Sequence, residues 1–225
     1  MSRPTARPLL LLVALTLTLS LSGYADTVLT LTTPAPVNQQ YQQTANSPCV
    51  FGDPSCKQPA GFGLTSIAGG GSLQDWGTTA LGGAISSPTY TGQQILNAVG
   101  SNFLVGIDVN QANHLSPTLT YFAEFINGVQ VAHFGTDGSS TGTTLILTNN
   151  GNGYADAILT GFVAPGANDS VVFKLTYTGA NDGTEEFFLI NTSSPPPIVP
   201  EPSSLVLLGT GLIGAGTAIR KKFFL

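Results

Sequence analysis

The stretch from residue 26 to residue 192 is divided into short runs, each of which ends at a cluster of Gly, Asn, Asp or Pro. The runs are apolar or alternate between apolar and polar residues, and helical periodicity is scarcely visible. Such runs predict strands joined by turns. We therefore expect an all-β domain over residues 26–192, built as an antiparallel β-sandwich or a jelly roll. The expected strands are Thr27–Thr32, Phe103–Val109, Thr118–Ile126, Val129–Phe134, Thr143–Leu147, Tyr154–Phe162, Ser170–Tyr177 and Glu185–Asn191.

Three local features refine this expectation. Asn127-Gly128 lies between two of the runs, and because both residues tolerate positive φ, the pair predicts a type I′ hairpin turn. Residues Gln93–Val99, bounded by glycines, are the one stretch expected to be helical. Residues Pro34–Thr91 carry little strand signal, so we expect long loops there that cover the domain.

The chain begins with Arg3 and Arg7, followed by the apolar run Leu9–Leu21 and small residues up to Ala25. This order of basic, apolar and small residues is typical of a secretory signal peptide. We expect residues 1–25 to be removed after Ala25 during export through the inner membrane. An uncleaved anchor is the alternative, but the run is shorter than the about 20 apolar residues that span a bilayer.

The other end of the chain has three parts in order. Residues 193–199 form a Pro-rich linker that continues neither a sheet nor a helix. Residues 200–225 then carry a short acidic motif, a glycine-rich transmembrane helix and a basic cluster that would stay on the cytoplasmic side. A buried helix is the alternative, which the flanks disfavour. The motif is Pro200, Glu201 and Pro202, the helix is Leu205–Ile219, and the cluster is Arg220, Lys221 and Lys222.

This C-terminal segment resembles the sorting signal of PEP-CTERM proteins, whose Pro-Glu-Pro motif it matches directly. The resemblance implies recognition by an exosortase, cleavage near the motif, and release or transfer to the cell surface or extracellular matrix. It also implies a transient membrane anchor and a Gram-negative producer, typically one that makes exopolysaccharide. The expected partners are thus exosortase, the secretion machinery and the membrane, with exopolysaccharide as a further candidate. The resemblance covers only residues 200–225, and so it implies an address rather than an activity.

The distribution of charge excludes one class of partner. Most cations lie at the two ends, so the body between Asp26 and Val199 has eleven acidic residues against Lys57 and Lys174, a formal charge of −9. Proteins that bind nucleic acid need clustered cations to neutralise phosphates. We therefore expect no nucleic-acid partner, and neutral polymers or divalent cations suit the body better.

The two cysteines, Cys49 and Cys56, are separated by a stretch that contains Gly52 and Asp53-Pro54. These turn residues allow the chain to fold back, and an exported protein meets an oxidising environment. We expect a local disulfide. A metal pair is the alternative, but no histidine or second cysteine pair stands nearby.

We assign no catalytic residue, because no residues follow the spacing of a known catalytic motif. Glycan hydrolysis needs two carboxylates held across a cleft. Most candidate carboxylates adjoin turns and have an ordinary explanation, whereas Glu124 should share one face of its strand with Phe122 and Ile126, which makes it the least ordinary. The candidate carboxylates are Asp108, Glu124, Asp156, Glu185 and Glu186. A Ser-His-Asp triad that uses one of the two histidines, His114 or His133, is an alternative, but no motif marks one.

Some oxygen-rich turns suit calcium, which prefers carboxylate, carbonyl and amide ligands. Asp108, Asn110 and Asp156 are the candidates for a structural calcium ion, although they lack the spacing of an EF-hand and polar turns are the default explanation. We expect no other cofactor.

Aromatic residues suggest one more kind of site. Trp76, Tyr90 and Tyr121 are candidates for a platform on which sugar rings stack, with membership of the core as the stronger explanation.

We expect a non-enzymatic protein of the cell surface or extracellular matrix that acts by adhesion, by association with exopolysaccharide or as a structural component. The alternative is an extracellular glycan hydrolase that uses acidic residues.

Overall fold

The computed structural model describes residues 24–36, 41–67, 74–76, 84–110, 117–147, 153–180 and 184–193, with the backbone alone for 74–76 and 180. Nearly all of the expected signal peptide and the whole sorting segment, residues 200–225, lie outside the described residues. Within the described part of the chain, strands predominate and α1 (Gly92–Val99) is the one helix, so the all-β prediction is confirmed. No helix in that part is long and apolar enough to cross a membrane.

The larger sheet has the strand order β1-β10-β9-β13-β5, with β6 and β7 also paired to β13 and β11 paired to β9. β9 and β13 are its long central strands, and they supply most of the pairing. The eight strands that the described residues contribute are β1 (Thr27–Val28), β5 (Gln74–Trp76), β6 (Ile85–Ser86), β7 (Tyr90–Thr91), β9 (Thr118–Ile126), β10 (Val129–Gly135), β11 (Thr143–Thr144) and β13 (Ser170–Ala180).

The smaller sheet has the order β2-β12-β8-β14-β3-β4. Its central strand β8 lies between β12 and β14 and is buried along its whole length. The six strands found in the described residues are β2 (Thr30–Thr32), β3 (Cys49–Gly52), β4 (Thr65–Ser66), β8 (Phe103–Asp108), β12 (Ala157–Thr160) and β14 (Glu186–Asn191).

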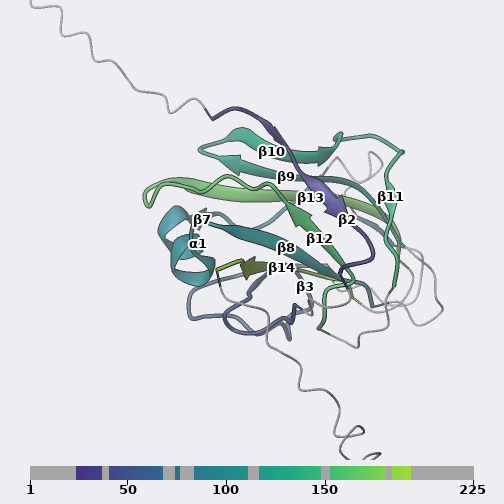
Figure 1. Ribbon diagram of the computed structural model, residues 1–225, viewed down its shortest axis with the longest axis horizontal. Coiled ribbons are helices and arrows are strands. Elements are labelled where there is room, and N and C mark those ends of the chain that lie inside the picture. The colour runs from purple at the N-terminus through teal and green to yellow at the C-terminus, as the bar shows by residue number, and fades with distance from the viewer. Residues whose placement is uncertain are drawn as a thin grey trace, which may run out of the picture.

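The two sheets form two layers around a shared core of buried apolar side chains (Figure 1). Phe122 of the larger sheet stacks on Phe187 of the smaller sheet, with ring centroids 6.0 Å apart, and meets Phe51 edge to face at 6.2 Å. Aromatic pairs with these geometries add to the stabilisation that burial supplies. The two sheets therefore share one apolar core, while β3, β8 and β14 are also buried on their other face, in a second cluster.

The pairing departs from the expected antiparallel arrangement. β1 runs parallel to β10, and β3 runs parallel to β4, so both sheets are mixed. The strand orders do not confirm a jelly roll. Alternation along one strand carries no information about the direction of its neighbour, which is why the sequence could not distinguish the two cases.

The expected strand Thr27–Thr32 is divided between the sheets, because β1 pairs with β10 and β2 pairs with β12 (Figure 1). Leu29, at the crossing point, is buried and donates its N–H to the carbonyl of His133 at 2.7 Å. We call residues 27–32 the N-terminal clasp. It joins the edges of the two layers.

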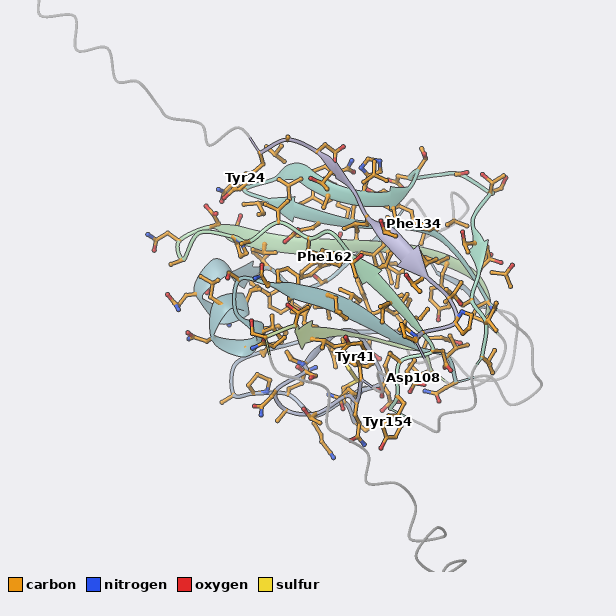
Figure 2. The ribbon with its side chains drawn as sticks, viewed as in Figure 1. Tyr24, Tyr41, Asp108, Phe134, Tyr154 and Phe162 are labelled. Atoms are coloured by element: carbon orange, nitrogen blue, oxygen red, sulfur yellow. A yellow bond between two sulfur atoms is a disulfide. The ribbon has the colours of Figure 1, made fainter. Side chains whose placement is uncertain are left out.

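Side chains before the clasp also contact the larger sheet. Tyr24 Oη donates to Asp169 Oδ2 at 2.9 Å, and Figure 2 shows Tyr24 at the edge of that layer. The Asp26 carboxylate accepts a hydrogen bond from Gln130 Nε2 at 2.9 Å and lies 2.9 Å from His133 Nδ1. The chain therefore contacts the domain on both sides of the bond after Ala25.

The other strand predictions vary in accuracy. Thr118–Ile126 is confirmed with its predicted bounds, whereas Thr143–Leu147 shrinks to β11 and Tyr154–Phe162 to β12. The expected loop region Pro34–Thr91 instead contains β3 to β7. These strands are two to four residues long, too short for periodicity to reveal.

The predicted type I′ hairpin is confirmed. Asn127 and Gly128 have φ values of 53° and 80°, both positive as this turn requires. Val129 then pairs with Ile126, so β9 continues directly into β10.

Candidate functional site

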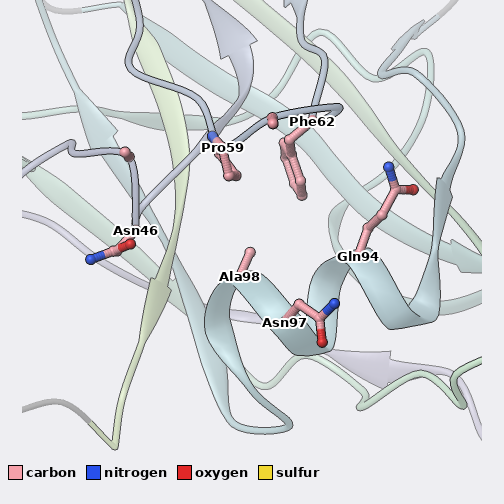
Figure 3. A pocket seen from close by; sticks show the side chains of 8 residues that line it. Asn46, Pro59, Phe62, Gln94, Asn97 and Ala98 are labelled. Carbon is pink, nitrogen blue, oxygen red and sulfur yellow. The ribbon is translucent and has the colours of Figure 1, made fainter.

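A hollow of about 160 Å³ lies beside α1, between the helix and two loops. We call it the α1 pocket. Among the described residues that line it none is charged. Figure 3 shows Phe62 and Ala98 pointing into the hollow from opposite sides, with amide side chains around them. Its principal lining residues are Asn46, Pro59, Phe62, Gln94, Asn97 and Ala98.

The helical wall of the pocket is fixed by a capping box. Thr91 is the N-cap of α1, and Gln94 Oε1 accepts a hydrogen bond from the Thr91 N–H at 2.8 Å. The other end of the same amide donates to the carbonyl of Gly61 at 2.9 Å. Ile95 and Val99 are buried on the opposite face of the helix. Gln94 therefore ties the helix to the facing loop.

The N-terminus of α1 is also held closely. Gly92 and Gln93 donate their N–H groups to the carbonyls of Asp169 and Ala167 at 2.7 and 2.9 Å. A Cβ at position 92 would lie 1.9 Å from the carbonyl oxygen of Gly166, so only glycine permits this approach.

The two loops opposite the helix are joined by Gln43, a buried side chain. Its Nε2 donates to the carbonyls of Lys57 at 2.7 Å and Ser47 at 3.2 Å, while its Oε1 accepts from the Lys57 N–H at 3.2 Å. The predicted disulfide between Cys49 and Cys56 is present and joins the first residue of β3 to the second of these loops. The loop wall is therefore cross-linked by hydrogen bonds and by a covalent bond.

The aromatic part of the lining is fixed in the same way. Phe62 stacks on Tyr90 with ring centroids 4.5 Å apart. Tyr90 in turn donates its hydroxyl to the carbonyl of Gly63 at 2.7 Å. Phe62 is 6% exposed, so a small part of the ring is open to the pocket.

Two amides of the lining retain unused hydrogen-bonding groups. Asn97 is exposed; its Oδ1 accepts from Gln93 Nε2 at 2.8 Å, and its Nδ2 makes no hydrogen bond to the described part of the chain. The exposed side chain of Asn46 makes none to that part either. The pocket thus combines a fixed apolar surface with free, uncharged donors and acceptors.

Glu124 shares one face of β9 with Phe122 and Ile126, as predicted, and this face points into the core. The side chain is 0% exposed. Its Oε2 accepts from the Val163 N–H at 2.9 Å, and no described group hydrogen-bonds to Oε1. Burial raises the pKa of Glu124 to about 8, against the smaller opposing effect of the Val163 bond. A carboxyl group sealed in this way has no route to a substrate.

The three predicted calcium ligands lie close together at the end of β8, beside the loops that carry Tyr41 and Tyr154 (Figure 2). Asp108 Oδ2 accepts from the Gly153 N–H and from Asn110 Nδ2 at 3.1 Å. Asp156 Oδ2 accepts from the Val109 N–H at 2.9 Å. Burial, together with the like charges of Glu186 and Asp156, raises the pKa of Asp108 to about 7.

This geometry suits backbone bracing better than a cation. Asn110 presents its N–H group to Asp108, whereas a shared calcium ion needs its oxygen. Within the described residues, the one set of three metal-ligating side chains with donor atoms within 4.8 Å of one another is Cys49, Cys56 and Glu186. The two cysteines are bonded to each other. Calcium therefore stays a prediction.

Glu185 and Glu186 adjoin the Asp182-Gly183 turn signal, as the sequence indicates, but they are not ordinary exposed carboxylates. Both are buried, and Tyr177 donates its hydroxyl to Glu185 Oε2 at 2.7 Å. Glu186 opens β14 opposite Asp108 of β8, and burial raises its pKa. The nearby Asp182-Gly183 turn signal hid this burial, because turn residues mark a chain reversal but not how deeply the next residues are buried.

The remaining candidates are the aromatic residues and the two histidines. Tyr90 and Tyr121 are buried, so they do not form an exposed platform for sugars. The side chain of Trp76 and all of His114 lie outside the described residues. His133 pairs with Asp26 on the larger sheet.

Sequence reasoning missed Phe62 and the amides of the α1 pocket. Phe62 lies between Gly61 and Gly63, and a lone aromatic residue between glycines is the one signal that marks it. The facing residues on α1 come from a segment about thirty positions further along the chain. Phe62 and the residues of α1 come together only in the folded chain.

The C-terminal segment matches a known protein-family model. Residues 199–222 match the family model described as the PEP-CTERM protein-sorting motif. No curated protein matches the chain. The predicted resemblance at Pro200, Glu201 and Pro202 is therefore confirmed, and the motif implies export and recognition by the exosortase machinery. This chain carries a PEP-CTERM protein-sorting motif at residues 199–222.

Proposed function

We propose that this protein acts without catalysis at the cell surface or in the extracellular matrix, where it binds exopolysaccharide through the α1 pocket. The domain of residues 26–192 is then a β-sandwich that presents the pocket. The helix Leu205–Ile219 is a temporary membrane anchor that exosortase processing removes. The observation that carries the proposal is the preformed, uncharged lining of the pocket with its two unused amides.

Rigidity supports a binding role. Gln94, Gln43 and the disulfide fix the walls before any ligand arrives. A ligand therefore loses little free energy to ordering of the site. Polysaccharide hydroxyl groups pair with amides, and the apolar faces of sugar rings contact residues such as Phe62.

The hydrolase alternative receives less support. It needs two carboxylates that reach the same substrate. Glu124 and Glu185 are sealed in the core, while Asp108 and Asp156 accept hydrogen bonds from the backbone. These groups are engaged within the folded domain, and the described residues provide no accessible carboxylate pair in the pocket.

The test is electrophoresis of the purified exported chain through native gels that contain polysaccharide extracted from the matrix of the producing cells. We expect slower migration than in plain gels and no release of reducing ends. Release of reducing ends would establish the hydrolase instead. If migration is unchanged and nothing is released, a purely structural role replaces the proposal.

A further inference from the structure

We propose that the α1 pocket binds one uncharged sugar unit of a polysaccharide and rejects units that carry a carboxylate, sulfate or phosphate. This inference rests on the proposed function and names its ligand. It follows from the charge, the free hydrogen-bonding groups and the size of the pocket.

Charge comes first. The lysines of the body do not serve the pocket: Lys174 lies with its ammonium 4.3 Å from the Phe125 ring centroid, on the larger sheet, and Lys57 is not among the described lining residues. An anionic sugar that entered would lose hydration without gaining a cationic partner. It would also approach a body with a formal charge of −9. Both effects favour an uncharged unit.

The free amides match hydroxyl groups. A hydroxyl both donates and accepts, and an amide offers a donor and an acceptor side by side. Gln94 has both ends engaged, so it shapes the wall and does not contact the ligand through a free group. Asn97 Nδ2 and the Asn46 side chain are the groups left to do so.

The apolar lining and the volume limit the ligand to one ring. Pro59 and Ala98, with the small open part of the Phe62 ring, supply a surface for the C–H face of a sugar. The volume of about 160 Å³ is well below the roughly 300–1,000 Å³ of pockets for larger ligands. A pocket that binds a single sugar ring binds its ligand weakly at each site. Many copies displayed on a surface against a repeating polymer would bind far more tightly.

The experiment measures retardation of the exported chain in native gels containing dextran, mannan or galactan, and in gels containing dextran sulfate. Dextran and dextran sulfate share a backbone and differ in charge. We expect retardation by at least one uncharged polymer and none by dextran sulfate. Asn97→Ala and Asn46→Ala should each weaken binding on the order of five- to tenfold, the loss of one hydrogen bond.

Two further variants make the result specific. Ala98→Leu fills the hollow while keeping both amides, and it should abolish retardation. Asn168→Ala changes an exposed asparagine that is not among the lining residues, and it should bind as the wild type does. Thermal unfolding confirms that each variant is folded.

The outcomes separate the two proposals. Unchanged binding by both pocket asparagine variants and Ala98→Leu, or tighter binding of dextran sulfate than of dextran, overturns the inference and leaves exopolysaccharide binding at another surface. Failure of every polymer, including the native matrix polysaccharide, overturns the proposed function itself.

Discussion

Glu124 holds a proton in the folded protein at pH values where it would lose that proton in the unfolded chain. Its pKa rises from an ordinary value of 4.5 to about 8 because the core excludes water. Between these values folding takes up a proton, so the contribution of Glu124 to the free energy of unfolding is greatest below pH 4.5 and falls as the pH rises towards 8.

Glu124→Gln should remove this decrease in the free energy of unfolding at high pH. The amide keeps an acceptor for the Val163 N–H and has no charge to bury. We expect little change at pH 4.5 and a gain on the order of a few kcal/mol in the free energy of unfolding at pH 8.5. Urea unfolding at both pH values measures it. An equal pH dependence in variant and wild type would contradict the assignment.

Stability should depend on pH through Asp108 in the same direction as through Glu124. Its pKa rises from 3.8 to about 7, so its contribution to stability falls as the pH rises across that range. Asp108→Asn retains an acceptor for the Gly153 N–H, and in the presence of a chelator it should raise the thermal midpoint at pH 8.

The same variant tests the calcium prediction. A bound ion would stabilise the wild type as calcium is added, and Asp108→Asn would lose that response. If calcium has no effect on either protein, the three residues brace the backbone without a cation.

At the residue scale, the sequence predicted features that depend on the local residue pattern. It missed features that depend on how deeply a residue is buried in the folded domain. Alternation placed Glu124 correctly beside Phe122, because a strand has a strict period of two. It could not show that Glu185 is buried, since the strand begins only at the following residue. Phe62 faces α1 only after the chain has folded.

At the scale of elements, the disulfide and Gln43 make one cross-linked loop region. The Cys49→Ala and Cys56→Ala double variant should lose about 2 kcal/mol of stability, the amount expected for so short a closed loop. It should also weaken polysaccharide binding, because the loop wall of the α1 pocket loosens. Urea unfolding and gel retardation measure the two effects.

Reduction of the wild type provides the matched control, and it should reproduce both effects. A stability loss with unchanged binding would show that the hydrogen bonds of Gln43, Gln94 and Tyr90 maintain the pocket without the disulfide.

Long strands were predictable, whereas short ones were not. β9 and its hairpin follow from alternation and from Asn127-Gly128, which act over a few neighbouring residues. β3 is a four-residue strand with every position buried, and it exists because β14 and β4 flank it. Its conformation is decided by distant partners, which a single stretch of sequence does not reveal.

At the scale of the whole molecule, the ends direct the protein and the middle carries the binding function that we propose. Changing Pro200, Glu201 and Pro202 to alanines should leave the folded domain intact, since these residues lie beyond its last strand. We expect the wild type to be shortened and to reach the surface, while the variant keeps its C-terminal segment in the membrane fraction. Immunoblots of cell fractions with a tag inserted before residue 193 measure this, and identical processing would refute the role of the motif.

The contacts of Tyr24 and Asp26 with the larger sheet place a condition on the order of events during export. The bond expected to be cut, after Ala25, lies between Tyr24, which contacts Asp169, and Asp26, which contacts His133. A protease acts on an extended segment that fits its cleft, and these contacts hold the segment against the sheet instead. The signal peptide should therefore be removed before β1 pairs with β10, and a precursor that folds too early would protect its own cleavage site.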